Sequence, residues 1–262
     1  MDLKSILESA NKIKVSIVMQ VNLENYSKSR VLAEDKFYRA VDSFKNQLYK
    51  NAELIIVADG CDKTYHHYMQ SFRNDSNIKF AYLDRRGDNL MYSKVSTEQG
   101  DYTYFRGLAR NIGCSIASGE VITYMDSDDY LMPNHTLVTM LHYNASPDSD
   151  WWLNNTWYDH ENVIHSDQNA DVMIDPNQIP SVNIELLPYA GLFKAVRVKE
   201  DKSAMSPWLL AHKRDININW RDTVGGSEDV DFYNRMILEY RRGELVSTPI
   251  YVRCHLHPHW DV

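Results

Sequence analysis

Three carboxylates stand close together at Asp126, Asp128 and Asp129, directly after the apolar run at residues 121–125. Carboxylates this close repel one another unless a cation lies between them, and oxygen-rich sites suit Mg²⁺ or Mn²⁺. A divalent ion held here could neutralise a diphosphate as it leaves. The alternative is a solvated turn in which Asp128 or Asp129 caps the helix that follows.

A second acidic segment, with the sequence GSEDVD, begins at residue 226 and contains Glu228 and Asp229. A carboxylate at a cleft could act as a general base and take the proton from an acceptor hydroxyl. The same residues could equally be helix caps, because negative charge is favoured at a helix N-terminus.

Three histidines alternate near the end of the chain, at His255, His257 and His259. On a strand this spacing puts all three side chains on one face. Neutral imidazole binds Mn²⁺ or Zn²⁺, so His255 is a candidate metal ligand. The alternative is an exposed tail.

Other polar residues lie near these segments. Asp59 follows an apolar run and could accept a hydrogen bond from a nucleotide base, or could be a turn residue before Gly60. Arg106 and Arg110 precede the first acidic cluster and could contact phosphates or pair with its carboxylates. The aromatic group at 151–158 favours a place in the core over stacking on sugars.

The elements that must position these residues follow from hydrophobic patterning. Short apolar runs predict four buried strands, at residues 15–19, 54–58, 78–83 and 121–125. Apolar spacing predicts helices at 37–48, 65–72, 107–117 and 227–240, the last capped by Ser227. Strands linked by helices imply a parallel sheet with right-handed crossovers. Asp59 and the acidic cluster at 126–129 then fall at the carboxyl edge, where such sheets bind ligands.

Composition narrows the class of protein. The chain has 262 residues and a formal net charge of −8, which disfavours nucleic acid as a partner. No apolar run approaches the roughly 20 residues that cross a bilayer. The three cysteines are widely spaced and predict reduced thiols. We therefore expect a cytoplasmic protein, or one held at the inner face of a membrane through a partner.

Several segments, taken in order, resemble the family 2 glycosyltransferases. They cover residues 13–145 and, more loosely, 185–260, with the sequences KVSIVM, FYRAVDSFKNQLYKNAELIIVADGCD, GLARNIGCSIASGEVITYMDSDDYLMP, LFKAVRV, SEDVDFYNRM and YVRCH. The resemblance implies the GT-A fold, an α/β fold with a Rossmann-like, mostly parallel central sheet flanked by helices. It divides the chain into a lead-in at 1–14, a nucleotide-sugar-binding half at 15–130 and an acceptor-binding and catalytic half at 131–262.

The resemblance also implies an activity and residue roles. The activity is inverting transfer of a sugar from a nucleoside diphosphate, with UDP favoured, to a saccharide or lipid-linked saccharide in glycan or polysaccharide assembly. In the donor site, Asp59 would read the base, Arg110 would lie near the donor and Asp126 would contact ribose or metal. Asp128 and His255 would bind Mn²⁺ or Mg²⁺. Asp229 would be the catalytic base, supported by Glu228.

Two other classes stay open. Where the family has Pro-Thr-Tyr-Asn after its first strand, this chain has residues 20–23, QVNL, and Ala58 replaces the first aspartate of the family's second strand end. These departures motivate a non-catalytic homologue that binds sugar nucleotides. A metal-dependent nucleotidyltransferase or phosphodiesterase would need a further carboxylate pair around the metal.

Overall fold

The structure is a computed structural model. It describes residues 12–23, 32–84, 107–159, 172–173, 196–198, 210–221, 228–240 and 242–254. Among these residues, no helix is both long and apolar enough to cross a bilayer.

A four-stranded parallel unit forms one half of the sheet, in the order β3-β2-β1-β4. Its strands are β1 (Val15–Val21), β2 (Ala52–Asp59), β3 (Ile78–Leu83) and β4 (Val121–Asp126). β1 and β2 are buried almost throughout, because helices cover both faces of the sheet. All four strands expected from the apolar runs are confirmed, with β1, β2 and β4 slightly longer than the sequence predicts.

The other half of the sheet comes mostly from later parts of the chain and is mixed. β9 pairs antiparallel with both β4 and β6, so it lies between them. On the other side of β6, β10 pairs with it in parallel, and β5 pairs antiparallel with β10 at the end of the order. These strands are β5 (Tyr130–Leu131), β6 (Trp151–Asp159), β9 (Leu210–Lys213) and β10 (Gly243–Cys254). Two short strands, β7 (Val172–Met173) and β8 (Val196–Val198), pair with each other beside β6.

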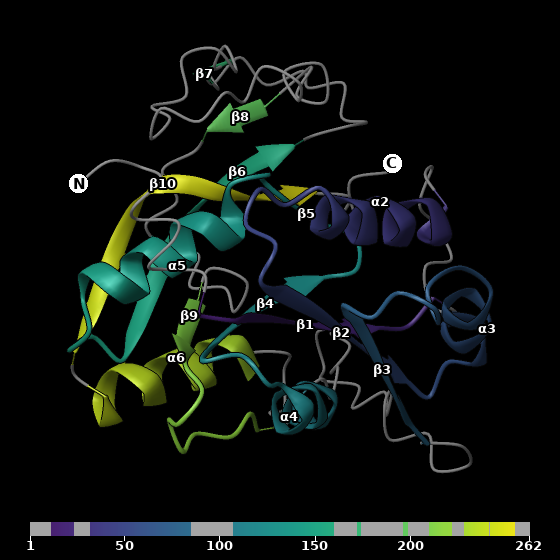
Figure 1. Cartoon of the computed structure of the whole chain (residues 1–262), viewed down its shortest axis with the longest axis horizontal. Helices are drawn as coiled ribbons and strands as arrows, with labels where there is room; N and C mark the ends of the chain where they lie inside the picture. The colour runs from purple at the N-terminus through teal and green to yellow at the C-terminus, as the bar shows by residue number, and fades with distance from the viewer. Residues whose placement is uncertain are drawn as a thin grey trace, which may run out of the picture.

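Within the described residues, five helices pack on the two faces of this sheet, as Figure 1 shows. One apolar core lies between one face of the sheet and the helices α2 (Ala33–Lys45), α5 (His135–Ala145) and the end of α3 (Asp62–Ser71). A second core lies under α4 (Gly107–Ile116) and α6 (Glu228–Glu239). Trp151 is buried in this second core and Trp152 in a smaller apolar cluster with Val121, Val138 and Ala211, which confirms the core interpretation for that pair.

The starts of two helices, and the residue that caps a third, differ from what the sequence predicts. α2 and α3 both begin a few residues earlier than the apolar spacing predicts, because polar first turns carry no hydrophobic signal. The interpretation of Asp128 or Asp129 as a helix cap is wrong. The turn after β4 leads into β5, and the N-cap of α5 is Asn134. The expected cap Ser227 lies outside the described residues.

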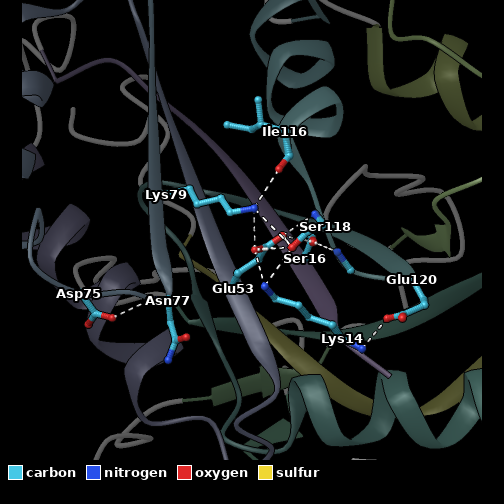
Figure 2. Close-up of polar contacts among 10 residues, drawn as sticks. Lys14, Ser16, Glu53, Asp75, Asn77, Lys79, Ile116, Ser118 and Glu120 are labelled. Atoms are coloured by element: carbon cyan, nitrogen blue, oxygen red, sulfur yellow. Dashed lines mark hydrogen bonds and ion pairs between the residues drawn. The ribbon is translucent and has the colours of Figure 1, made fainter. Parts of the chain in front are cut away.

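The amino edge of the parallel unit is held by a buried carboxylate at Glu53 (Figure 2). Lys14 and Lys79 place their Nζ atoms 2.7 and 3.0 Å from its Oε2, and Ser16 Oγ donates to Oε1 at 2.7 Å. Ser118 adds its backbone N–H to Oε1 at 2.6 Å. Burial alone would raise the pKa of Glu53, but these hydrogen bonds and cations outweigh it and lower the pKa to about 2.

Candidate functional site

The candidate site begins in the turn that follows β4, at the opposite edge of the sheet from Glu53. Asp126 is the last residue of β4, and the N–H of Asp129 donates to its carbonyl at 3.3 Å. Carboxylate oxygens of Asp126, Asp128 and Asp129 all lie within 4.8 Å of one another. Carboxylate oxygens are ligands that suit Mg²⁺ and Mn²⁺. The residues present therefore fit a divalent cation.

A buried arginine joins this turn to the second acidic segment. Arg110, on α4, has a side chain only 4% exposed. Its Nη1 donates to Glu228 Oε1 at 3.1 Å, and its Nη2 lies 3.5 Å from Asp126 Oδ1. Arg110 therefore pairs with a carboxylate of each acidic segment. The two acidic segments, about a hundred residues apart in the chain, meet at one guanidinium.

Aromatic packing fixes Arg110 from its other side. The guanidinium carbon lies 4.6 Å from the ring centroid of Trp220, which stacks on Phe232 of α6 at 3.9 Å. Asn111 holds the backbone of Trp220 through two hydrogen bonds, of 2.9 and 2.8 Å. Sequence reasoning missed Trp220, because a lone tryptophan in an irregular segment has no period that identifies its partners.

A chain of hydrogen bonds through His212 and Tyr124 supports the stacked pair of Trp220 and Phe232. His212 Nδ1 lies 2.8 Å from the carbonyl of Lys213, which can only accept, so Nδ1 carries the proton. Burial lowers the pKa of His212 to about 4, which keeps the ring neutral. Its Nε2 therefore accepts from the Tyr124 hydroxyl at 2.7 Å. Tyr124 in turn meets Trp220 edge to face, with ring centroids 5.0 Å apart.

The first turn of α6 presents Glu228, Asp229 and Asp231. Glu228 is buried against Arg110, whereas Asp229 is partly exposed. Asp231 pairs instead along its own helix with Arg235, at 2.8 Å. A partly exposed carboxylate beside a buried, fixed one has the access that proton transfer with a substrate needs.

Asp59 lies at the same carboxyl edge of the sheet, at the end of β2. β1 separates it from β4, which puts the two strand ends about 10 Å apart. The Asp59 side chain is buried, and Asn22 Nδ2 donates to its carbonyl at 2.9 Å. Gly60, with φ of 63°, then turns the chain. Two sequence candidates, His255 and Arg106, lie outside the described residues.

No protein-family model matches the chain. Curated proteins that are similar to part of it include two glycosyltransferases. An uncharacterized glycosyltransferase of Haemophilus influenzae is 32% identical over 119 residues, which is 45% of this chain and 37% of that protein. Glycosyltransferase GlyA of Streptococcus pneumoniae is 25% identical over 119 residues, 45% of this chain and 13% of that protein. The chain thus spans well under half the length of these relatives.

Solved structures share the fold across nearly the whole chain. TarS residues 1–349 of S. aureus, in complex with UDP-GlcNAc, gives a TM-score of 0.60 at 16% identity, over 94% of this chain and 59% of that chain. Mannosyltransferase PcManGT of Pyrobaculum calidifontis, with GDP-Man and Mn²⁺, gives 0.51 at 12% identity, over 91% and 56%. The fold is the GT-A type of these glycosyltransferases, and the predicted fold class is confirmed.

Proposed function

We propose that this protein is a metal-assisted, inverting glycosyltransferase that moves a sugar from a nucleoside diphosphate, with UDP favoured, to an acceptor hydroxyl. The observation that carries the proposal is the shared guanidinium of Arg110. It brings the carboxylate turn after β4 and the acidic start of α6 to one place. A transferase of this kind needs those two groups together, one for the leaving diphosphate and one for the acceptor.

In the proposed reaction Asp229 is the general base. Its carboxylate takes the proton of the acceptor hydroxyl. The electron pair left on the acceptor oxygen forms the new bond to the anomeric carbon. The bond from that carbon to the diphosphate breaks, and the diphosphate leaves with its electron pair. A single displacement of this kind inverts the anomeric configuration. Glu228, held by Arg110, fixes the turn of α6 from which Asp229 acts.

On the donor side, Asp128 would be the chief metal ligand and Asp126 would contact the metal or the ribose. The bound Mn²⁺ or Mg²⁺ would neutralise charge on the departing diphosphate. Asp59 is assigned to the nucleotide base. It is the last residue of β2, so it lies at the same carboxyl edge of the sheet as the end of β4. His255 remains assigned to the metal by its resemblance alone. The two structural neighbours hold UDP-GlcNAc, and GDP-Man with Mn²⁺, which supports a donor of this chemical class.

Outside the donor site the assignments rest on the resemblance. The acceptor would be a saccharide or a lipid-linked saccharide, in glycan or polysaccharide assembly. We also propose a place in the cytoplasm or at the inner face of a membrane, which is the expectation from the composition and the cysteine spacing.

A panel of nucleotide sugars tests the proposal. Unfolding temperatures would be measured with UDP-sugars and GDP-mannose, each with MnCl₂ and with EDTA. Ligand at a hundred times its Kd adds about 2.7 kcal/mol of apparent stability. We expect at least one donor to raise the unfolding temperature with Mn²⁺ and not with EDTA. Free monosaccharides are the control, and the absence of a shift with every donor contradicts the proposal.

A further inference from the structure

Three polar side chains at four-residue spacing, Arg39, Ser43 and Gln47, lie on α2 and just beyond its end. Arg39 and Ser43 share one face of the helix, and Gln47 lies two residues past the last helical residue, Lys45. All three reach the backbone of the segment that runs from the carboxylate turn into α5. We refer to these three residues as the α2 stripe.

Arg39 contacts the carboxylate turn directly. Its Nη2 donates to the backbone carbonyl of Asp128 at 2.9 Å, across 89 positions of sequence. The guanidinium carbon lies 5.1 Å from the ring centroid of Tyr130, the first residue of β5. A charged donor and a ring contact thus fix the backbone on both sides of Asp129.

The rest of the stripe holds the chain beyond the turn. The N–H of Leu131 donates to Ser43 Oγ at 3.0 Å. Gln47 is buried, donates through Nε2 to the carbonyl of Met132 at 2.8 Å and accepts the N–H of Thr136 through Oε1 at 3.0 Å. The segment after the turn is therefore bonded to α2 and to the residue two positions beyond its end at several successive points.

We propose that Arg39 is a positioning residue for the metal site, because it fixes the backbone of the turn that presents Asp126, Asp128 and Asp129. The inference rests on the proposed function, since it concerns the cation of that site. Three converging carboxylates repel one another and tend to splay apart. A turn held from α2 keeps their oxygens close before the cation arrives.

The change in Mn²⁺ affinity on replacement of Arg39 has one sign if Arg39 positions the turn and the opposite sign if only its charge matters. Arg39 is itself a cation, so its charge alone opposes binding of a second cation nearby. Loss of that charge would tighten Mn²⁺ binding. Loss of the hydrogen bond to Asp128 would instead loosen the turn and weaken Mn²⁺ binding, and residues that orient ligands typically account for 10–100-fold in metal affinity.

The experiment is a titration of the whole chain with Mn²⁺, followed by electron paramagnetic resonance of the free ion. We expect Arg39→Met to weaken Mn²⁺ binding by at least tenfold and Arg39→Lys, which keeps the charge and a donor, to restore part of the loss. Lys50→Met is the matched control. It removes one cation and one bond to a carbonyl, that of Lys45, at the far end of the same helix. Its Mn²⁺ affinity should match the wild type.

Two outcomes overturn the inference: Mn²⁺ binding by Arg39→Met that is unchanged or tighter, or a wild-type chain that binds no Mn²⁺. If Arg39→Met does not fold, Arg39→Lys alone decides, since it must then bind Mn²⁺ more weakly than the wild type. Donor consumption by the wild type in EDTA is measured in parallel. If the wild type binds no Mn²⁺ but consumes donor in EDTA, glycosyl transfer stands while the metal site and the role of Arg39 fall.

Discussion

At the scale of single residues, Arg110 is the point where distant parts of the chain depend on each other. Its guanidinium is almost fully buried and meets one carboxylate from β4 and one from α6. A buried charge left without its partner is costly, whereas an apolar pair of similar volume in the same place is often tolerated. Stability and activity should therefore respond differently to changes at this pair.

We expect Arg110→Met to lower the free energy of unfolding by about 3–5 kcal/mol, because Glu228 keeps a buried charge without compensation. The double variant Arg110→Met with Glu228→Met should recover most of that loss but not the activity. Urea denaturation of the four proteins in this cycle gives the energies. Arg242→Met serves as control, since Arg242 is 64% exposed in its pair with Asp150 and should contribute at most about 1 kcal/mol. A fully stable Arg110→Met variant contradicts this view.

The sequence was sufficient to locate the acidic segments but not their connection. Asp126 and Glu228 could be selected because each stands at the boundary of a strongly patterned element. The pairing of Arg110 with both depends on long-range packing, which leaves no local pattern. The wrong cap assignment for Asp129 has a related cause, because the two-residue strand β5 is too short to show a period.

At the scale of elements, α4 must lie very close to β1 to put Arg110 over the end of the sheet. Gly113 makes this approach possible. A Cβ atom at Gly113 would stand 2.3 Å from Val18 Cγ1, well inside contact distance. The helix therefore sits at a depth that only glycine permits at this position.

We expect Gly113→Ala to lower the free energy of unfolding by about 1–3 kcal/mol through overpacking. That loss would exceed the gain of about 1 kcal/mol in helix propensity. Ser115→Ala, on the exposed side of α4, should stay within about 0.5 kcal/mol of the wild type. Thermal or urea unfolding measures both, and the addition of Val18→Ala should rescue part of the loss. A Gly113→Ala variant as stable as the wild type would rule out the close approach.

Whether a segment forms a helix or a strand was predictable where hydrophobic periodicity is strong. The side-chain contacts between elements were not predictable. The four parallel strands follow from continuous apolar runs. The α2 stripe was missed, since Ser43 and Gln47 are polar residues of a kind that usually faces water. Cys61 was treated as an isolated thiol, yet its Sγ accepts the N–H of Thr64 and caps α3. Such partners depend on tertiary packing that a single sequence does not display.

At the scale of the whole molecule, the parallel unit has a stabilising cluster at one edge and the candidate site at the other. The Glu53 cluster joins the segment before β1, the start of β2, the start of β3 and the connection between α4 and β4 (Figure 2). Its carboxylate has a folded-state pKa of about 2, below its ordinary value of 4.5. The stabilisation it supplies is therefore complete above about pH 4.5 and is lost as the pH falls toward 2.

We expect Glu53→Gln to reduce the free energy of unfolding at pH 7 by on the order of 3 kcal/mol, the free energy that corresponds to this pKa shift. The variant should also lose part of the fall in stability between pH 4.5 and pH 2. Urea denaturation at a series of pH values tests both effects. Glu34→Gln, which removes a partly exposed pair with Lys63, should cost less than about 1 kcal/mol. An unchanged pH dependence in Glu53→Gln would contradict the assignment.

The most direct test of the proposed transfer is the release of nucleoside diphosphate from the bound donor to water, in Mn²⁺, by the wild type and Asp229→Asn. We expect the wild type to release it and Asp229→Asn to be at least about a hundredfold slower, with its donor-dependent rise in unfolding temperature intact. Asp231→Asn changes a carboxylate of the same helical turn that pairs with Arg235, and should retain the wild-type rate. Equal rates for Asp229→Asn and the wild type would contradict the central claim.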